Sequence, residues 1–367
     1  MARARGWYPA VAMLEGQDAM TARKPPRSSL PTLFAAALAG AVVSVTLASA
    51  RADQPAQPAQ PSMVCRVSGE APGKPGEMIY DAHSSGSAIA KLTGASVPLE
   101  LAHVVPPGGG RVQVSTGTSR PYLRIDGWAS VDAFRFYAAT DLPIAGAGGH
   151  VSIARGQTLN ITAVQGDELS VAHRVLGSSH QAVTAKLGCD QATLSYPSQS
   201  FPDVPERART YQMGHDTLDL YNSPGGDVVF TLALDQDVRA IFWSDEHRGG
   251  YVHVHLRTDL VIDAWAPAHE LEPLHHQEVF GPSSAPRPPR PRTLALQNPP
   301  ELLTATEELT IYHAPHRGSA TLGVVEVGAR FYPMEQSGEM TNVMPENLGV
   351  LPLDNLGFWV ITADLPQ

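Results

Sequence analysis

The chain has 367 residues, of which 43% are hydrophobic, and it contains 32 glycines and 32 prolines. This length can build several small cores, and the glycine and proline content favours many short strands joined by turns over long helices. There are 26 basic and 36 acidic residues, and the formal net charge is -10. Nucleic acid and an anionic membrane surface are therefore disfavoured as partners, because both attract clustered cationic groups.

The N-terminal extension, residues 1–52, ends in a segment with the order of an export signal. A basic stretch at 20–29 precedes the apolar run 30–50, and two A-x-A motifs occupy 48–52. Positive charge, an apolar segment and a small-residue cleavage site together predict a secretory signal peptide, with Met20 as the favoured start. The alternative is an uncleaved anchor, because the run is long enough to span a bilayer. We expect an exported protein, periplasmic or secreted, with no stable membrane insertion after cleavage.

Both cysteines follow the export signal and a Pro/Gln spacer at 53–62. In an oxidising compartment, Cys65 and Cys189 are expected to form a single disulfide. That bond would join the start of the first β unit to the end of the second. The alternative is two buried free thiols.

One pattern occurs three times along the rest of the chain. Each copy has an apolar residue and a tyrosine, then a turn of small residues, then a short apolar strand. Each copy closes 44 to 48 residues later with a tryptophan, and an apolar residue stands six positions beyond it. The successive Tyr, Trp and apolar positions are Tyr80, Trp128 and Phe134; Tyr221, Trp265 and Leu271; and Tyr312, Trp359 and Leu365.

Each copy is only about 55 to 65 residues long, and its strands are short, with alternating apolar and polar residues. An open sheet of that size would leave exposed edges and little core, so closure into a small barrel is expected. The predicted fold class is therefore all-β, with tandem small barrels. In this fold the tyrosines and tryptophans are expected to fill the core with their large side chains.

The closing pattern Gly127-Trp128-Ala129, with Phe134 beyond it, resembles the end of bacterial SH3-like (SH3b) domains. Ala264-Trp265-Ala266 matches it more loosely, and the segment from Leu220 to Pro224 matches the family's opening. The usual N-V-R triplet is absent. The resemblance covers roughly half of the chain and implies tandem SH3-like β-barrels joined by Pro-rich linkers, three of them clear and one divergent.

The predicted domain plan places a divergent unit, which has no tryptophan, between the first two clear copies. The plan comprises unit 1 (63–140), divergent unit 2 (141–195), a linker (196–207), unit 3 (208–276), a Pro/Arg-rich linker (277–300) and unit 4 (301–367). Extended backbone in the second linker, about 20 residues at ~3.1 Å each, could hold its neighbours up to ~60 Å apart. We expect unit 4 to move independently. The linker's PRPPRPR stretch can be read as a ligand for an SH3 domain or as a stiff spacer.

No catalytic pattern emerges from the sequence. There is no G-x-S-x-G nucleophile elbow, and the nearest approach to H-E-x-x-H, starting at His269, has Pro273 at its second ligand position. We therefore predict no catalytic residue, no cofactor and no enzymatic activity.

The segment EHRGGYVHVHLRTD is the most suggestive polar cluster. His253 and His255 are two residues apart in a predicted strand and share one face, and His247 could reach them from the preceding turn. With Asp245 as a fourth ligand, a zinc or copper site is conceivable. The favoured interpretation is a solvated barrel face whose Val252 and Val254 fill the core.

The repeated aromatic residues are the candidate ligand-binding residues, either as parts of binding grooves or as barrel core. They are Tyr80, Trp128, Tyr221, Trp265, Tyr312 and Trp359. The leading hypothesis is a non-catalytic exported binding or scaffold protein that holds cell-wall peptidoglycan, wall peptides or an envelope protein, with several weak sites gaining by avidity. The alternatives are a structural protein–protein interaction module with no wall ligand, or a metal-binding protein centred on His253 and His255.

Overall fold

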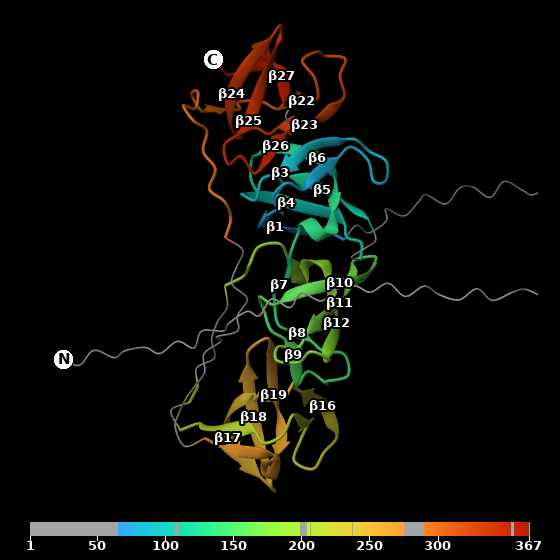
Figure 1. Cartoon of the computed structure of the whole chain (residues 1–367), viewed down its shortest axis with the longest axis vertical. Coiled ribbons are helices and arrows are strands. Elements are labelled where there is room, and N and C mark those ends of the chain that lie inside the picture. The colour runs from blue at the N-terminus through green and yellow to red at the C-terminus, as the bar shows by residue number, and fades with distance from the viewer. Residues whose placement is uncertain are drawn as a thin grey trace, which may run out of the picture. The chain divides into compact units, whose positions relative to one another are not determined.

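The computed structural model describes residues 65–106, 110–198, 204–205, 207–236, 238–274, 290–353 and 356–366 (Figure 1). Within these ranges the chain is all-β, as predicted, with antiparallel sheets and four short 3₁₀ helices. The predicted signal peptide, the Pro/Gln spacer and residues 277–289 lie outside the described residues. No helix in the described part has the length and apolar character that a membrane crossing requires.

Unit 1 is a six-stranded antiparallel arrangement with strand order β1-β4-β5-β6-β2-β3. Apolar and polar residues alternate along β4 and β5, so that Val97, Leu99 and Leu101 of one and Val112 and Val114 of the other are buried. The elements are β1 (Val67–Pro72), β2 (Met78–Tyr80), β3 (Ala88–Leu92), β4 (Ser96–His103), β5 (Arg111–Thr116), β6 (Leu123–Ser130) and the 3₁₀ helix η1 (Val131–Ala133).

Unit 3 has the same strand order as unit 1, written β16-β15-β19-β18-β17-β14, with the short β20 added beyond β14. Its elements are β14 (Arg209–Met213), β15 (Thr217–Tyr221), β16 (Val228–Ala233), β17 (Ile241–Arg248), β18 (Tyr251–Arg257), β19 (Leu260–Pro267), η3 (Ala268–Glu270) and β20 (Leu271–Pro273).

Unit 4 repeats that order as β23-β22-β27-β25-β24-β21. Its elements are β21 (Leu303–Thr304), β22 (Leu309–Tyr312), β23 (Thr321–Val325), β24 (Arg330–Ser337), β25 (Met340–Pro345), β26 (Val350–Pro352), β27 (Trp359–Ile361) and η4 (Thr362–Asp364). The sequence repeat therefore corresponds to a repeated strand order.

The repeated tyrosine and tryptophan are cross-strand partners in all three units. Each tyrosine ends the second strand of its unit directly after a β-bulge, and it pairs with the tryptophan of the same unit. The residue before each tyrosine is fully buried, and a 3₁₀ helix begins three residues after each tryptophan. The pairs are Tyr80 with Trp128, Tyr221 with Trp265, and Tyr312 with Trp359. The same local arrangement, a tyrosine paired with a tryptophan across two strands, therefore recurs in each unit.

Unit 2 has a different organisation. Its sheet has the order β12-β11-β10-β7-β13, while β8 and β9 join the sheet of unit 3 through β19. The strand β7 belongs to this sheet although it precedes residue 141. The elements are β7 (Phe136–Ala138), β8 (Leu142–Pro143), β9 (Val151–Ile153), β10 (Thr158–Gln165), β11 (Glu168–Arg174), β12 (Ala182–Gly188), η2 (Cys189–Gln191) and β13 (Ala192–Thr193).

Unit 4 is joined to unit 1 by strand pairing, so the expectation that it moves independently was wrong. β23 pairs with β6 and β26 pairs with β3, which makes one thirteen-stranded sheet of the two units. The backbone N–H of Tyr122 also donates to Glu326 at 3.0 Å. The physical reason is that strands at a sheet edge carry unpaired backbone N–H and C=O groups. Pairing between the two units gives these groups hydrogen-bond partners.

The two cysteines form a disulfide, Cys65–Cys189, across 124 positions of sequence. Both residues are buried, at 0% and 7% exposure. The bond joins the segment that leads into β1 to the 3₁₀ helix η2 of unit 2.

Candidate functional site

The three central strands of unit 3 present a row of rings and carboxylates on one face. Residues two apart in a strand point to the same side, and the cross-strand register brings Trp243 opposite His255 and His253 opposite Trp265. The opposite face of the same strands is core, because Phe242, Val252, Val254 and Ala264 have at most 1% exposure. The row is Trp243 and Asp245 from β17, His253 and His255 from β18, and Asp263 and Trp265 from β19.

The rings of the row are in continuous contact. Trp243 stacks on His255 with ring centroids 4.0 Å apart, and Trp265 stacks on His253 at 4.8 Å. The two imidazoles meet edge to face at 4.3 Å. Each imidazole therefore has a tryptophan on one side and its neighbour on the other, which restricts its rotation.

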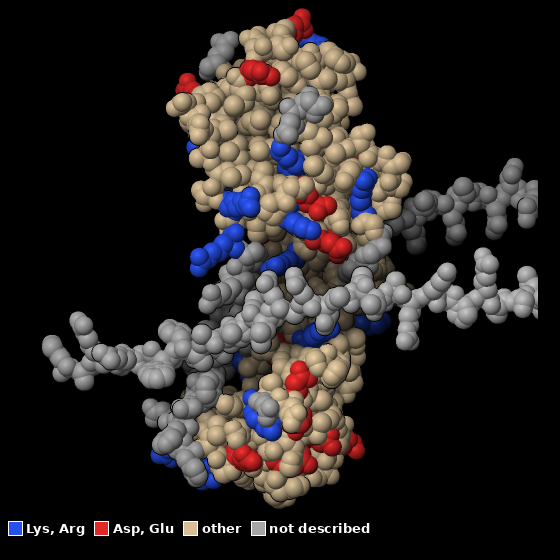
Figure 2. All heavy atoms as spheres, viewed as in Figure 1, with Lys and Arg blue, Asp and Glu red and all other residues tan. Residues whose placement is uncertain are grey.

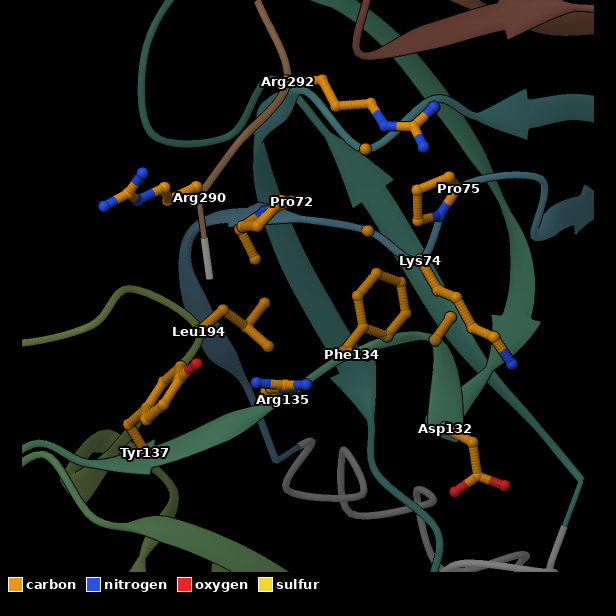
Figure 3. Close-up of a pocket in the computed structure, with 14 residues that line it drawn as sticks. Pro72, Lys74, Pro75, Asp132, Phe134, Arg135, Tyr137, Leu194, Arg290 and Arg292 are labelled. Atoms are coloured by element: carbon orange, nitrogen blue, oxygen red, sulfur yellow. The ribbon is translucent and has the colours of Figure 1, made fainter. Parts of the chain in front are cut away.

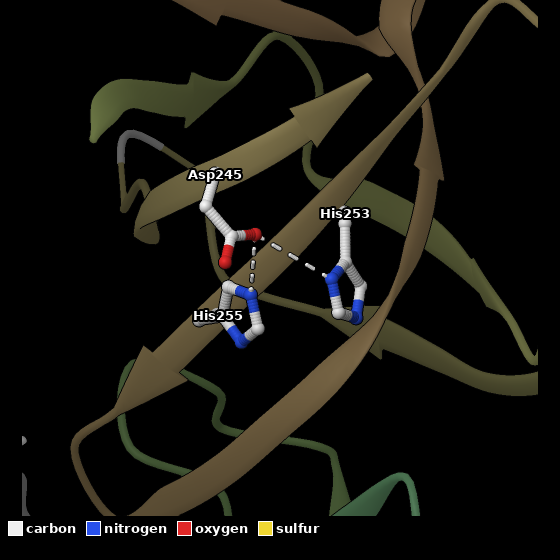
Figure 4. A group of neighbouring side chains, drawn as sticks. All are labelled: Asp245, His253 and His255. Carbon is white, nitrogen blue, oxygen red and sulfur yellow. Dashed lines mark hydrogen bonds and ion pairs between the residues drawn. The ribbon is translucent and has the colours of Figure 1, made fainter. Parts of the chain in front are cut away.

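Two carboxylates bracket the histidine pair. Asp245 Oδ1 lies 3.2 Å from Nε2 of His255 and 3.6 Å from Nδ1 of His253, and Figure 4 shows the three side chains converging from adjacent strands. On the other side, Asp263 Oδ1 lies 2.7 Å from Nε2 of His253 and 3.4 Å from Nδ1 of His255. The imidazoles are mostly covered, whereas both carboxylates are half exposed or more.

A β-bulge positions Asp245. The register between β17 and β18 shifts between Trp243 and Glu246, where the buried Ser244 donates its hydroxyl to the carbonyl of Glu246 at 3.2 Å. Bulges re-aim side chains in this way. Burial raises the pKa of Asp245, but its hydrogen bond and charge interaction with His255 outweigh that effect, and the net pKa lies below the ordinary value.

His247 does not join the cluster, so this part of the metal-site hypothesis was wrong. It pairs with Val252, a core residue, and therefore points to the side of the sheet opposite to His253. Its Nε2 lies 2.8 Å from the hydroxyl of Tyr211. Sequence reasoning instead missed Asp263 and Trp243, although Asp263 stands two positions before the repeated Trp265 and so had to share its face.

The repeated tyrosine–tryptophan pairs differ in how open they are. In unit 1 the Arg111 guanidinium lies 3.2 Å from the centre of the Tyr80 ring, and His83 packs edge-on against Trp128. In unit 3 Tyr221 contacts Tyr251 at 5.4 Å between ring centroids.

Unit 4 is the most closed of the three. Its Trp359 is only 7% exposed and belongs to the core, whereas Trp128 and Trp265 are half-buried. The structure therefore keeps each predicted pair together. The tyrosine is half-buried in all three units, and the tryptophan is buried only in unit 4.

A second candidate is a basic pocket of about 450 Å³ where unit 1 meets the start of unit 2 and the described end of the Pro/Arg-rich linker (Figure 3). Its lining includes Lys74, Arg135, Arg290 and Arg292 around Phe134. By contrast, Figure 2 shows Asp and Glu side chains gathered over β16 to β19 of unit 3. A basic pocket attracts anions and an acidic face attracts cations, so the two candidates differ in the ligands they suit.

No protein-family model matches the chain, and no curated protein matches it. Two solved structures do match, those of NlpC1 and NlpC2 from Trichomonas vaginalis, with 13% and 12% sequence identity. Each match covers 45% of this chain, and 47% and 49% of the respective neighbours, with a TM-score of 0.16. The chain thus spans about half the length of the structures it matches, and at this TM-score the likeness carries no argument about fold or mechanism.

The prediction that the chain is not an enzyme does not stand beside these two NlpC neighbours, and no activity is assigned to the chain from them. The prediction relied on the absence of known catalytic motifs, and such an absence is not evidence against an activity. The non-enzymatic assignment is withdrawn.

Proposed function

We propose that the chain is an exported binding protein of the cell envelope, built from SH3-like units, that holds peptidoglycan or wall peptides through the aromatic face of unit 3. The observation that supports this proposal is the tyrosine–tryptophan pair that recurs in units 1, 3 and 4, in which the tryptophan is half-buried in units 1 and 3 and buried in unit 4. A tryptophan needed only for packing would be equally buried in each copy.

Unit 3 is the best candidate for the binding unit. Its Tyr221, Tyr251 and Trp265 gather half-buried rings at one end of β15, β18 and β19. Rings with an apolar body and a polar tip suit ligands that are apolar on one face and wet on the other, such as sugar rings and short peptides. The carboxylates Asp245 and Asp263 beside them accept hydrogen bonds from hydroxyl and amide groups.

Unit 1 would add at most a weaker site. Arg111 occupies one face of Tyr80, so a ligand ring would have to displace a cation–π contact. Even a weak second site raises the total affinity when both units engage one polymer. Unit 4, with its tryptophan in the core, has a structural role in this scheme.

The test is a pulldown of the mature chain on purified peptidoglycan sacculi. We expect Tyr221→Ala with Tyr251→Ala to weaken binding about threefold to tenfold, because an aromatic contact contributes about 0.5–1.5 kcal/mol. Tyr→Phe at both positions should retain most of the binding, and Tyr80→Ala is the matched control with a smaller expected loss. Absence of binding at low and moderate salt would refute the wall ligand and leave a protein partner; an equal loss in Tyr80→Ala would refute the assignment to unit 3.

A further inference from the structure

The histidine–carboxylate cluster of unit 3 has more N···O contacts than two neutral imidazoles have N–H groups to fill them. Four N···O contacts, at 2.7, 3.2, 3.4 and 3.6 Å, join the two imidazoles to Asp245 and Asp263. A neutral imidazole has one N–H, and an ionised carboxylate has none. Two neutral histidines can therefore make only two of the four contacts as hydrogen bonds. The other two contacts set a nitrogen lone pair against a carboxylate oxygen, which is repulsive unless a proton or a metal ion lies between them.

The geometry indicates where that cation belongs. The shortest contact, from Nε2 of His253 to Asp263, is the natural place for the N–H of this ring, which leaves its Nδ1 lone pair facing Asp245. Nε2 of His255 lies at hydrogen-bond distance from Asp245, so metal binding would require this ring to carry its N–H on Nδ1, toward Asp263, which turns the Nε2 lone pair toward Asp245 too. A carboxylate that accepts the far N–H of a ligating histidine is the usual support of a protein metal site. Asp263 is placed to do this for both rings.

Two of the three separations between the convergent atoms are close to those around one small metal ion. Zinc bonds imidazole nitrogen at about 2.0–2.1 Å, so two ligand atoms of a tetrahedral site lie about 3.3 Å apart. Asp245 Oδ1 is 3.2 Å from the nitrogen of His255 and 3.6 Å from that of His253. All three ligand atoms lie within 4.8 Å of one another, so a small inward movement of the imidazoles would complete the triangle.

The other units show that the fold does not require this cluster. The partner of the repeated tryptophan is His253 in unit 3, Gln113 in unit 1 and Asn342 in unit 4. Unit 1 keeps a carboxylate where unit 3 has Asp263, but there Asp126 accepts a hydrogen bond from the hydroxyl of Ser115. The serine hydroxyl has a proton to donate to the carboxylate. Among the three repeated units, only unit 3 therefore has more nitrogen–carboxylate contacts than two neutral imidazoles can fill with N–H groups.

We infer that Asp245, His253 and His255 bind one divalent transition-metal ion, with Zn²⁺ as the best fit, and that Asp263 orients both imidazoles. Two nitrogens and one oxygen form a borderline ligand set that favours zinc or copper over magnesium or calcium. Three protein ligands leave a fourth position, and the exposure of Asp245 opens that position to water or to a ligand group. The inference does not rest on a wall ligand, since the metal is measured alone.

The experiment uses the mature chain purified without a histidine tag, stripped with a chelator and titrated with Zn²⁺ by calorimetry, with metal analysis of the dialysed complex. We expect one ion per chain and a Kd of about 1 µM or lower. Asp263→Asn should weaken binding about 10- to 100-fold by removing the acceptor that orients the rings. Cu²⁺ should bind more tightly than Zn²⁺, and millimolar Mg²⁺ should not compete.

The decisive variant is His253→Gln with His255→Ser, which installs the residues that unit 1 carries at the same register positions. Because unit 1 folds with this set, the variant should keep its thermal unfolding midpoint within a few degrees while losing at least 100-fold in Zn²⁺ affinity. His247→Ala is the matched control, since that ring faces Tyr211, and it should leave the affinity unchanged. Fewer than about 0.2 ions per wild-type chain, an unchanged affinity in the double variant, or equal competition by Mg²⁺ would overturn the inference.

Discussion

Removal of the disulfide should lower the free energy of unfolding of units 1 and 2 by an amount that depends on the length of the loop that the bond closes. The variant is Cys65→Ser with Cys189→Ser. The bond joins residues 124 positions apart, and the loop-closure entropy of a loop of that size is worth about 5 kcal/mol at 25 °C. The native geometry does not depend on the bond alone, because Ser195 Oγ accepts from the N–H of Glu70 at 2.8 Å. We therefore expect a folded but less stable protein.

The measurement is urea unfolding at neutral pH under non-reducing conditions, with hydrogen exchange at β1 and β12 to identify the region that opens. Wild type in excess reductant should match the serine variant, and reductant should leave the variant unchanged. A loss of stability of less than about 1 kcal/mol would show that the two units are held by their packing and not by the covalent bond.

Two further predictions concern the contacts between units. Asp259 accepts hydrogen bonds from His173 at 3.2 Å and from the N–H of Leu176; burial raises its pKa, but these bonds outweigh burial and lower it. The resulting stability is full above the ordinary aspartate pKa of about 4 and is lost as the pH falls through the lower folded value. Asp259→Asn should thus cost roughly 2–3 kcal/mol in urea unfolding at pH 7 and progressively less as the pH falls below the ordinary aspartate pKa, and a cost that does not change with pH would contradict the pair. Gly323→Ala should release β23 from β6, measured by faster hydrogen exchange in both strands, because a Cβ there would lie 1.9 Å from the carbonyl oxygen of Arg124. Gly318→Ala, with only ordinary contacts, is its control, and unchanged exchange in Gly323→Ala would refute the junction.

The repeat was predictable because its signal is local. Each tyrosine and tryptophan is fixed by its own unit, where a bulge and a 3₁₀ turn need those residues at nearly constant spacing. The disposition of unit 4 was not predictable in the same way. Pairing of β23 with β6 joins residues about 200 positions apart, and nothing in either strand alone records its partner. The strand order of unit 2 was also out of reach, because β8 and β9 complete a sheet whose other members follow much later in the chain.

The candidate site was predictable in part, because residues two apart in a strand point to the same face of the sheet. Spacing of two placed His253 and His255 on one face, and Asp245 was close enough to be considered. Sequence proximity then suggested His247, but strand register governs which face a residue joins, and pairing with Val252 excludes it. The same register places Asp263 opposite His255. Asp263 and His247 each stand eight positions from His255 in sequence, and only Asp263 lies on the face of the cluster.

The same tyrosine–tryptophan pair has different surroundings in the three units. In unit 4 its tryptophan is buried and the edge strand is joined to unit 1, so the unit braces the sheet. In unit 1 the tyrosine is capped by Arg111, which satisfies the ring within the fold. In unit 3 the partner of the tryptophan is an imidazole that lies between two carboxylates. Packing explains the repeated geometry of all three copies, and it leaves the histidine–carboxylate cluster of unit 3 as the feature that a bound metal ion would explain.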